Sequence, residues 1–481
     1  MNTESGKSPL THFLLIGLAA LAVRFLLLAA IGPQLLPDSY GYLEVSRNLA
    51  ETGTFSSLDP ATGKLAPFAM RVPVFHVLTA AIIKVFGPDT SWPFTFFNIL
   101  LSSATVVLTA AFFYSLAGPL AGLLAGYLMA FNPNSIYYSL EMLPDTLFSL
   151  FVLLAAMIGL RAVRKGSLKW YLGWGAAIGL TTLVKPVFKY YWAVPLIIMA
   201  GEKTLREKAL KKAAVLVLGC ALVVGPWLAR NYAELNFAGL ELTFGVNTIW
   251  ATTDLVRPST PGQAKEDPVL ASVRDIVAAS REPMLAMTNV KTRLNMTDKE
   301  VNHYLFKIGR EVMLKNPVKF SYRYVKNAVN FIVSGSSVVE LSYKLLPGGN
   351  NFKSLITASI ERNKTLPDEK KFAGIIKEAW ENGTWPALVI NVAARAACLM
   401  IFLVSAAGFI LFLKTDRPGA LVLGSLIAYF VLISAFTSGY DRYRLPIDPL
   451  LAGFFALGLG ADRLKKWFGA LNAPPTAQKG L

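Results

Sequence analysis

The stretch LLIGLAALAVRFLLLAAI, at residues 14–31, carries one charged side chain, Arg24, in an otherwise apolar run. A helix needs about 20 predominantly apolar residues to cross the hydrocarbon core of a bilayer. A comparable run at residues 389–413 lies near the other end of the chain. No small-residue cleavage site follows the first run, so we interpret it as a retained membrane span and not as a signal peptide.

The composition agrees with a membrane protein. Of the 481 residues, 54% are hydrophobic and only 16% are charged, whereas a soluble domain is about a quarter charged. The net charge of +17 could indicate a nucleic-acid partner, but many Lys and Arg residues flank apolar runs, as orientation signals do. We therefore expect a lipid bilayer and no nucleic acid as partner. Cys220 and Cys398 lie inside apolar runs and are interpreted as packing residues.

Apolar runs of this kind predict about ten membrane spans. Two further segments are interpreted as interfacial: residues 39–52 have the pattern of an amphipathic helix, and residues 72–86 are short for a span. The predicted spans are residues 12–31, 92–116, 120–131, 143–160, 170–184, 190–200, 213–228, 385–413, 420–436 and 445–461.

The short loops rich in Lys and Arg predict the orientation. If residues 72–86 do not cross, the loops at 161–169, 203–212 and 414–417 and the tail after residue 462 all fall on one side. That side is the cytoplasm under the positive-inside rule, so both termini are expected inside. The outer side then collects four segments: the loop around Asp38 and residues 132–145, 231–384 and 438–448.

The predicted fold class is an all-α polytopic membrane protein with an extracytoplasmic soluble domain. Residues 1–230 form an N-terminal membrane module, which includes the first outer loop at 32–91. The polar region 231–384 has the length of one small soluble domain. Residues 385–481 supply the last membrane helices and a cytoplasmic tail.

Asp38 is the first candidate for chemistry. It follows the first span in the sequence LLPDSYGY at residues 35–42. Asp is a common helix N-cap, and an amphipathic segment follows, so capping is one interpretation. The other is a general base at the membrane surface, because burial beside apolar groups can raise the pKa of a carboxyl. Both remain open at this stage.

Two further acids lie on the predicted outer side. Glu141 and Asp145 occur in YYSLEMLPDT at residues 137–146, where Pro144-Asp145 also has the form of a helix start. A functional role would be to orient an acceptor. Asp38 and Asp145 could also bind a divalent cation, Mg²⁺ or Mn²⁺, since carboxylate oxygens are its preferred ligands.

Five basic residues sit near the outer ends of predicted spans. Arginines on the outer side run against the orientation rule and therefore call for another explanation. Guanidinium groups bind phosphate oxygens in pairs, whereas snorkelling or pairing with nearby acids are the alternatives. The candidates for holding a lipid phosphate are Arg71, Lys185, Arg230, Arg442 and Arg444.

The sequence contains no Gly-rich phosphate loop, dinucleotide fingerprint or Ser-His-Asp arrangement. Acids and basic groups at one membrane face suit group transfer from a phosphate-bearing lipid. The alternative is a transporter or flippase of lipid-linked sugars. Transporters favour inverted repeats and ionisable groups near the middle of the membrane, whereas these acids lie at span ends.

Several short motifs resemble those of GT-C glycosyltransferases, in the branch of the bacterial protein O-mannosyltransferases and the lipid A aminoarabinose transferases. The resemblance covers most membrane segments in order and leaves out residues 231–384. Where that branch often has Glu-Lys-Pro-Pro, this chain has MRVP at residues 70–73. The other motifs are PDSYGY at 37–42, AETGTF at 50–55, NP at 132–133, PDT at 144–146, LVKP at 183–186, PWLARN at 226–231 and RYRLP at 442–446.

The resemblance implies a polyprenyl-phosphate sugar donor and a cell-envelope acceptor (lipid A or another lipid, a protein or a polysaccharide). It further implies that Asp38 deprotonates the acceptor hydroxyl and that the anomeric carbon is attacked with inversion. By the same resemblance Lys185, Arg442 and Arg444 steady the leaving phosphate, and Glu141 and Asp145 shape the acceptor side. The expected location is the bacterial inner membrane, with the active site facing the periplasm or the cell exterior.

Overall fold

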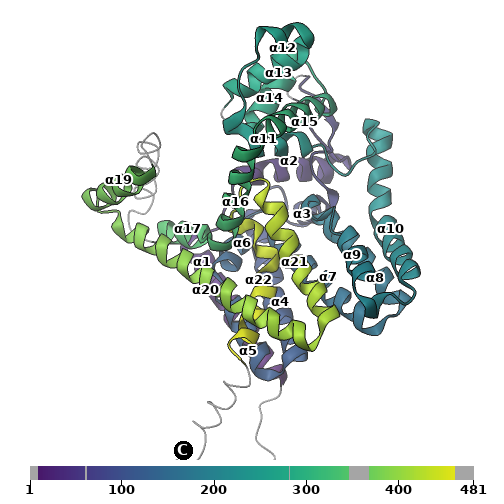
Figure 1. Cartoon of the computed structure of the whole chain (residues 1–481), viewed down its shortest axis with the longest axis vertical. Coiled ribbons are helices and arrows are strands. Elements are labelled where there is room, and N and C mark those ends of the chain that lie inside the picture. The colour runs from purple at the N-terminus through teal and green to yellow at the C-terminus, as the bar shows by residue number, and fades with distance from the viewer. Residues whose placement is uncertain (1–8, 60–61, 281, 346–367, 461–481) are drawn as a thin grey trace, which may run out of the picture.

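The fold is almost entirely helical (Figure 1). The computed structural model describes residues 9–59, 62–280, 282–345 and 368–460. Helices long and apolar enough to cross a membrane confirm the predicted all-α polytopic fold. Within the described residues there are six of them: α1 (Pro9–Ile31), α4 (Ser91–Ala117), α7 (Asp145–Lys165), α10 (Ala209–Leu235), α20 (Trp385–Thr415) and α21 (Arg417–Ala435).

The other four predicted spans form shorter helices. The shortest has nine residues, which cover about 14 Å of the roughly 30 Å hydrocarbon core. Prolines explain the interruptions, because proline cannot continue a helical hydrogen-bond ladder. Pro133 separates two of these segments, and Pro186 begins a 3₁₀ turn between two others. The helices are α5 (Pro119–Ala130) with α6 (Pro133–Ser139) after it, α8 (Leu168–Val184) with η1 (Pro186–Phe188) after it, α9 (Ala193–Gly201) and α22 (Asp448–Gly458).

Two ion pairs join the loops that are rich in Lys and Arg. Arg164, at the end of α7, lies 2.8 Å from Asp416, between α20 and α21. Arg417 lies 3.0 Å from Glu202, which precedes the turn η2 (Lys203–Leu205). The loops predicted to share one side of the membrane are therefore in contact. The predicted tail at 461–481 lies outside the described residues.

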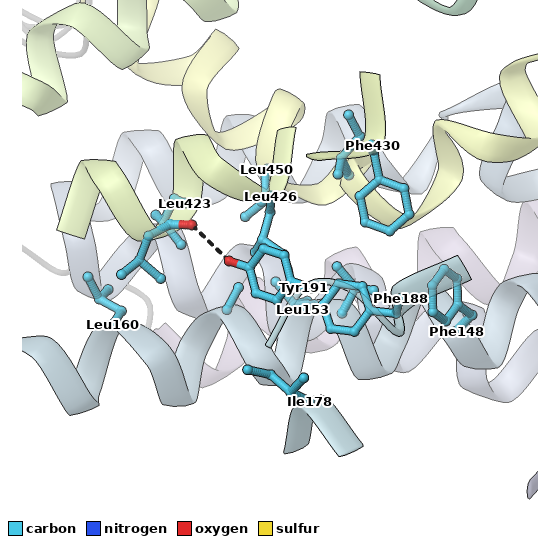
Figure 2. Close-up of a cluster of buried hydrophobic side chains, with 14 of the residues drawn as sticks. Phe148, Leu153, Leu160, Ile178, Phe188, Tyr191, Leu423, Leu426, Phe430 and Leu450 are labelled. Carbon is cyan, nitrogen blue, oxygen red and sulfur yellow. Dashed lines mark hydrogen bonds between the residues drawn. The ribbon is translucent and has the colours of Figure 1, made fainter. Parts of the chain in front are cut away.

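Aromatic packing fixes the chain just after α8 (Figure 2). The ring of Phe188 in η1 stacks on Tyr191, with 4.6 Å between centroids, and packs on Phe430 of α21. The Tyr191 hydroxyl lies 2.9 Å from that of Ser425, also in α21. Tyr429 donates to the Val187 carbonyl at 2.5 Å. These contacts hold the segment between α8 and α9 against α21, which matters for the cavity described below.

Helices α8 and α10 approach each other through glycine. A Cβ added at Gly175 would lie 1.9 Å from the carbonyl oxygen of Leu216. Reciprocally, a Cβ at Gly219 would lie 2.2 Å from the carbonyl oxygen of Leu172. Small residues allow such close backbone contact between membrane helices. The spacing of α8 and α10 therefore depends on two glycines, one on each helix, and each contacts the backbone of the other helix.

Arg24 is buried within α1, and its guanidinium is fully engaged by neighbouring helices. It donates to the hydroxyls of Ser102 and Ser135, each at 2.8 Å. It also donates to the carbonyl oxygens of Ala20 at 3.0 Å and Ala130 at 3.2 Å. These hydrogen bonds offset part of the cost of burying a charged group, and they join α1 to α4 and to the α5–α6 junction.

The segment predicted as the first outer loop folds into a helix, a hairpin and a second helix. The amphipathic segment predicted at 39–52 is α2 (Pro37–Thr52), and the segment 72–86 is α3 (Pro73–Phe86), an apolar helix of 14 residues. Two short antiparallel strands, β1 (Ser56–Leu58) and β2 (Leu65–Pro67), lie between them.

The region 231–384, predicted as one soluble domain, is subdivided. A helical bundle with its own buried core, which includes Val273, Val290 and Ile308, lies at one end of the molecule (Figure 1). The chain then returns to the membrane helices, where α16 packs on α21, and α17 packs on α20 and α6. The bundle comprises α11 (Phe244–Thr252), η3 (Thr253–Leu255), α12 (Pro261–Glu266), α13 (Pro268–Ala279), α14 (Pro283–Leu294) and α15 (Asp298–Lys315); the returning helices are α16 (Pro317–Val333), α17 (Ser336–Leu345) and α19 (Asp368–Glu381).

Candidate active site

Asp38 lies in the first turn of α2, and its carboxylate points to the side chain of Arg442, which is distant in the sequence. The chain enters the helix through extended Leu36 and then Pro37. The backbone N–H of Leu36 donates to the Ser39 hydroxyl at 3.1 Å, and the Asp38 side chain makes no capping bond. Instead, Oδ2 of Asp38 accepts from Nη1 of Arg442 at 2.7 Å. The helix-cap interpretation therefore does not describe the contacts of this carboxylate.

Asp145 is the buried counterpart of Asp38. It begins α7 directly after Pro144, is fully buried, and also makes no capping bond. Its Oδ1 accepts from Nζ of Lys185 at 2.6 Å. Its Oδ2 accepts from Nη2 of Arg442 at 3.1 Å, and Nε of Arg442 lies 3.2 Å from both oxygens. Arg442 thus joins two carboxylates from two segments that are far apart in the sequence.

The turn that carries Arg442 is held on both sides. It is the 3₁₀ turn η4 (Asp441–Tyr443), followed by η5 (Leu445–Ile447). The buried carboxylate of Asp441 accepts from the Ser336 hydroxyl at 2.7 Å, at the start of α17. Arg444 donates to the carbonyl oxygen of Ser334 at 2.9 Å. The direction of the Arg442 side chain is therefore set by the junction of α16 and α17.

Arg71 approaches the same site from the chain between β2 and α3. Its guanidinium carbon lies 3.6 Å from the centroid of the Tyr42 ring, and Nη1 donates to the Asp38 carbonyl oxygen at 3.3 Å. A Cβ at Gly41 would lie 3.1 Å from Nη2, so glycine leaves room for the guanidinium. Among the described residues, no carboxylate lies within ion-pair distance of Arg71. Its charge is the one that the site leaves unneutralised.

Asp38, Arg71, Lys185 and Arg442 line a cavity of about 530 Å³ between the membrane helices and the helical bundle. Its walls come from α2, from the segment after α8, from η4, and from α11 and α14. Half of the Asp38 side chain is exposed, whereas Asp145 lies behind Lys185 and Arg442. The charged side chains that line the cavity are Asp38, Glu44, Arg71, Lys185, Lys189, Glu241, Lys291, Asp298 and Arg442.

The electrostatics keep Asp38 ionised. Burial alone would raise the pKa of its carboxyl, but the guanidinium of Arg442, and then that of Arg71, hold the pKa below its ordinary value. Burial likewise lowers the pKa of Lys185, and the charge of Asp145 only partly restores it. For Arg442, burial is outweighed by the two carboxylates, and its pKa is raised. The cluster therefore consists of alternating charges at neutral pH.

Besides Asp145, three predicted site residues lie away from the cavity lining: Glu141, Arg230 and Arg444. Arg230 donates to the carbonyl oxygens of Phe55 at 2.7 Å and Phe68 at 2.9 Å, so it holds the hairpin segment on α10. Arg444 is buried and paired with Asp448 at 3.2 Å. These contacts occupy both guanidiniums, and we assign them no contact with a donor phosphate. Glu141 is buried, which raises its pKa.

A divalent-cation site at Asp38 and Asp145 has few ligands to draw on. Within the described residues, no three or more His, Cys, Asp or Glu side chains gather in one group. In this structure the guanidinium of Arg442 bridges the two carboxylates. A divalent cation at Asp38 and Asp145 therefore stays a prediction, and the proposed reaction uses none.

Five charged residues of the cavity wall are not among the predicted site residues: Glu44, Lys189, Glu241, Lys291 and Asp298. Lys189 pairs with Glu241 at 2.9 Å. Glu241 lies in the region for which no residue-level prediction was made, and Lys189 lay at the edge of a predicted span. The spacing of Lys185 and Lys189, four residues apart around Pro186, was a possible signal for two basic groups on one wall.

Part of the sequence matches a known protein family. Residues 70–229, less than half of the chain, match the model of the dolichyl-phosphate-mannose-protein mannosyltransferase family. Arg71, Asp145 and Lys185 lie inside that range, and Asp38 and Arg442 lie outside it. No curated protein matches the sequence at a significant level.

Among solved structures, the archaeal oligosaccharyltransferase AglB from Archaeoglobus fulgidus, in complex with an inhibitory peptide and a dolichol-phosphate, superposes with a TM-score of 0.51 at 13% identity. The match covers 97% of this chain and 52% of AglB, so this chain spans about half the length of that protein. ArnT from Cupriavidus metallidurans, bound to undecaprenyl phosphate, gives a TM-score of 0.38 at 15% identity over 96% of this chain and 81% of ArnT.

Proposed function

We propose that this chain is a membrane glycosyltransferase of the GT-C superfamily that moves a sugar from a polyprenyl-phosphate carrier to an acceptor hydroxyl. The carrying observation is that Asp38 and Asp145, from two outer segments, meet on the guanidinium of Arg442 beside a cavity of about 530 Å³. The acceptor is a cell-envelope lipid such as lipid A, a protein or a polysaccharide. The membrane is the bacterial inner membrane, and the cavity faces the periplasm or the cell exterior.

Asp38 has the geometry of the general base. Arg442 holds its Oδ2, and no described residue donates to Oδ1, which leaves that oxygen for an acceptor hydroxyl. The carboxyl is ionised at neutral pH and half exposed beside the cavity. A base must lie within hydrogen-bond reach of the proton that it takes, and a fixed orientation serves this. Asp145 is occupied by Lys185 and Arg442 and acts as the counter-charge that places them.

Arg71 is the first candidate for the carrier phosphate. Lys185 and Arg442 are each neutralised by a carboxylate in the resting site. Arg71 has no such partner among the described residues, and it lies over Tyr42 at the cavity wall. A planar guanidinium with free donors suits phosphate oxygens. In this proposal Arg71 binds the phosphate, while Lys185 and Arg442 stabilise the charge that develops as it leaves.

The reaction balances with these groups alone. The acceptor oxygen attacks the anomeric carbon, its proton passes to Oδ1 of Asp38, and a new C–O bond forms. The bond between the anomeric carbon and the phosphate oxygen breaks, and its electron pair stays on polyprenyl phosphate. Attack from the face opposite the leaving group inverts the anomeric centre. Cations that are already in place stabilise the leaving oxygen without reorganisation.

The test is transfer from a radiolabelled panel of polyprenyl-phosphate sugars to envelope extract, with purified wild type and Asp38→Asn. Asp89→Asn is the matched control, because Asp89 is an exposed outer acid that does not line the cavity. We expect transfer by wild type and by Asp89→Asn and none above background by Asp38→Asn. A parallel arm with chelator tests for a divalent cation. Transport of a lipid-linked sugar in liposomes without transfer would favour the flippase function instead.

A further inference from the structure

We infer that Glu241 and Lys189 form a subsite for the sugar headgroup, on the cavity wall between the segment after α8 and the chain that leads into α11. The inference rests on the proposed function, because it identifies the part of the cavity that binds the sugar being transferred. Lys189 Nζ lies 2.9 Å from Oε1 of Glu241, and both residues line the same cavity as Asp38 and Arg442. No role in binding the phosphate or moving the proton requires this pair.

The segment after α8, residues 185–192, carries two lysines that pair with two different carboxylates. Lys185 turns to Asp145, at the membrane helices, and Lys189 turns to Glu241, in the chain that leads into α11. Stacking of Phe188 on Tyr191 and Phe430 fixes the residues in between. One rigid segment therefore positions a phosphate-side cation and a second polar group in the same cavity.

The chemistry of the second group differs from that of the first. Lys189 is neutralised by Glu241, whose Oε2 also accepts from the Thr243 hydroxyl. The pair has no net charge to attract a phosphate. An ammonium group has three N–H donors, and a carboxylate has about four lone-pair sites, so each keeps capacity after this bond. A neighbouring donor and acceptor of this kind match the hydroxyl, or amino, groups of a sugar.

Aromatic rings surround the pair. Lys189 Nζ lies 5.3 Å from the centroid of Tyr190 and 5.5 Å from that of Phe244. Trp250, one turn and a half further along α11, lines the same cavity and is 40% exposed. Ligand sites are mostly apolar and aromatic with a few placed polar groups. Tyr190, Phe244 and Trp250 offer ring faces to a sugar, whose polar edge would meet Lys189 and Glu241.

The alternative is that the Lys189–Glu241 ion pair is only a structural latch, which holds the segment after α8 against the chain leading into α11. The two roles differ in what they predict. Loss of a latch would loosen the whole cavity and weaken every ligand. Loss of a sugar subsite would weaken only a carrier that bears a sugar, and it would leave the bare carrier phosphate unaffected.

The experiment measures the affinity of the full chain in nanodiscs for undecaprenyl phosphate, bare and loaded with glucose, mannose, galactose, N-acetylglucosamine or aminoarabinose. The ratio of loaded to bare affinity is the sugar increment. Glu241→Gln keeps the size of the side chain, and Lys189→Met removes the partner. Asp254→Asn is the matched control, because Asp254 pairs with Arg323 at 2.9 Å outside the cavity.

We expect a sugar increment for at least one loaded carrier in wild type and in Asp254→Asn. In Glu241→Gln and Lys189→Met that increment should fall about tenfold, the value of a hydrogen bond to a charged group, while bare undecaprenyl phosphate binds as in wild type. Equal weakening of bare and loaded carriers, an unchanged increment, or no increment in wild type would each overturn the subsite. An increment that depends on Glu241 without any sugar transfer would support the subsite and contradict the glycosyltransferase function.

Discussion

The guanidinium of Arg442 lies 2.7 Å from the carboxylate of Asp38, a residue 404 positions earlier in the chain. The same guanidinium reaches Asp145 at 3.1 Å, so the start of α2, the start of α7 and the turn η4 meet at one point. Each of these segments lies next to an apolar helix in the sequence. The site therefore forms only when N-terminal and C-terminal membrane helices are packed together.

Asp38→Asn should abolish turnover without weakening carrier binding. The amide keeps the size of the side chain but cannot take a proton, and general-base catalysis contributes roughly 10²–10⁴-fold. The substitution also removes a negative charge beside Arg442 and Arg71, so bare undecaprenyl phosphate should bind at least as tightly as to wild type. Single-turnover transfer and equilibrium binding measure the two effects separately. A fully active Asp38→Asn protein would sink the assignment of the base.

Replacement of Arg442 should change the pH dependence of transfer. In wild type the pKa of Asp38 is held below its ordinary value of about 3.9. The base therefore stays ionised, and activity should not fall with acid until the pH drops below that range. In Arg442→Met the chief attraction is gone and burial remains, so the pKa of Asp38 rises and the acid limb of kcat moves to higher pH.

Arg442→Lys provides the control for this shift. It keeps the positive charge, so its acid limb should lie closer to that of wild type, although the bidentate geometry is lost. Circular dichroism of both variants reports whether the helices remain folded, since Asp145 keeps Lys185 as partner in each case. An acid limb in Arg442→Met that coincides with wild type would show that Arg442 does not control the ionisation of Asp38.

Much of this arrangement was predictable from the sequence because it depends on local patterns. The apolar runs predicted the helices, and the Lys and Arg distribution placed Asp38, Asp145, Lys185 and Arg442 on one side. Residues 72–86 are short and bounded by Pro73 and Gly87, which correctly argued against a long span. These inferences need only helix length and charge counts.

The partners of the charged groups were not predictable, because pairing depends on packing between distant segments. An outer arginine can bind a phosphate, a carboxylate or a carbonyl, and the sequence of Arg442 and Arg444 does not distinguish these. The structure pairs Arg442 with Asp38 and buries Arg444 beside Asp448. Lys189 and Glu241 meet through the docking of the bundle on the membrane helices, for which no short-range pattern exists.

Arg71→Met should weaken binding of the carrier phosphate. The loss of affinity should be larger than for removal of any basic side chain on α2 or in the hairpin. The Arg71 guanidinium is at the cavity wall and has no carboxylate partner among the described residues. A hydrogen-bonded charge contact is worth about tenfold or more in affinity. Arg47→Met is the matched control, because Arg47 is an exposed arginine of α2 outside the cavity.

Titration of both variants with undecaprenyl phosphate at two salt concentrations measures the effect. The affinity of Arg47→Met should follow that of wild type at either concentration. If Arg71→Met keeps the affinity of wild type, Lys185 and Arg442 bind the phosphate instead. Their ion pairs with Asp145 and Asp38 would then have to break when the carrier binds.

The orientation predicts which engineered cysteines react from outside the cell. With Cys220 and Cys398 replaced by alanine, Thr62→Cys in the hairpin loop should react with a membrane-impermeant maleimide in intact cells. Lys165→Cys at the end of α7 should react only after the membrane is opened. Both positions are exposed, so accessibility within the protein does not separate them. The reverse labelling pattern would place the cavity in the cytoplasm and contradict a periplasmic or extracellular reaction.

The spacing of α8 and α10 should be sensitive to one added methyl group. In Gly175→Ala the new Cβ would lie 1.9 Å from the carbonyl oxygen of Leu216, so the helices must separate. Overpacking of this kind costs about 1–3 kcal/mol, and we expect a lower melting temperature in detergent. Gly173→Ala is the control on α8, because the nearest atom to a Cβ there is Cγ2 of Ile158 at 3.9 Å, an ordinary van der Waals contact. Alanine is the better helix former, so this control should melt at or above the wild-type temperature. Equal melting temperatures for Gly175→Ala and Gly173→Ala would show that the close approach does not stabilise the membrane module.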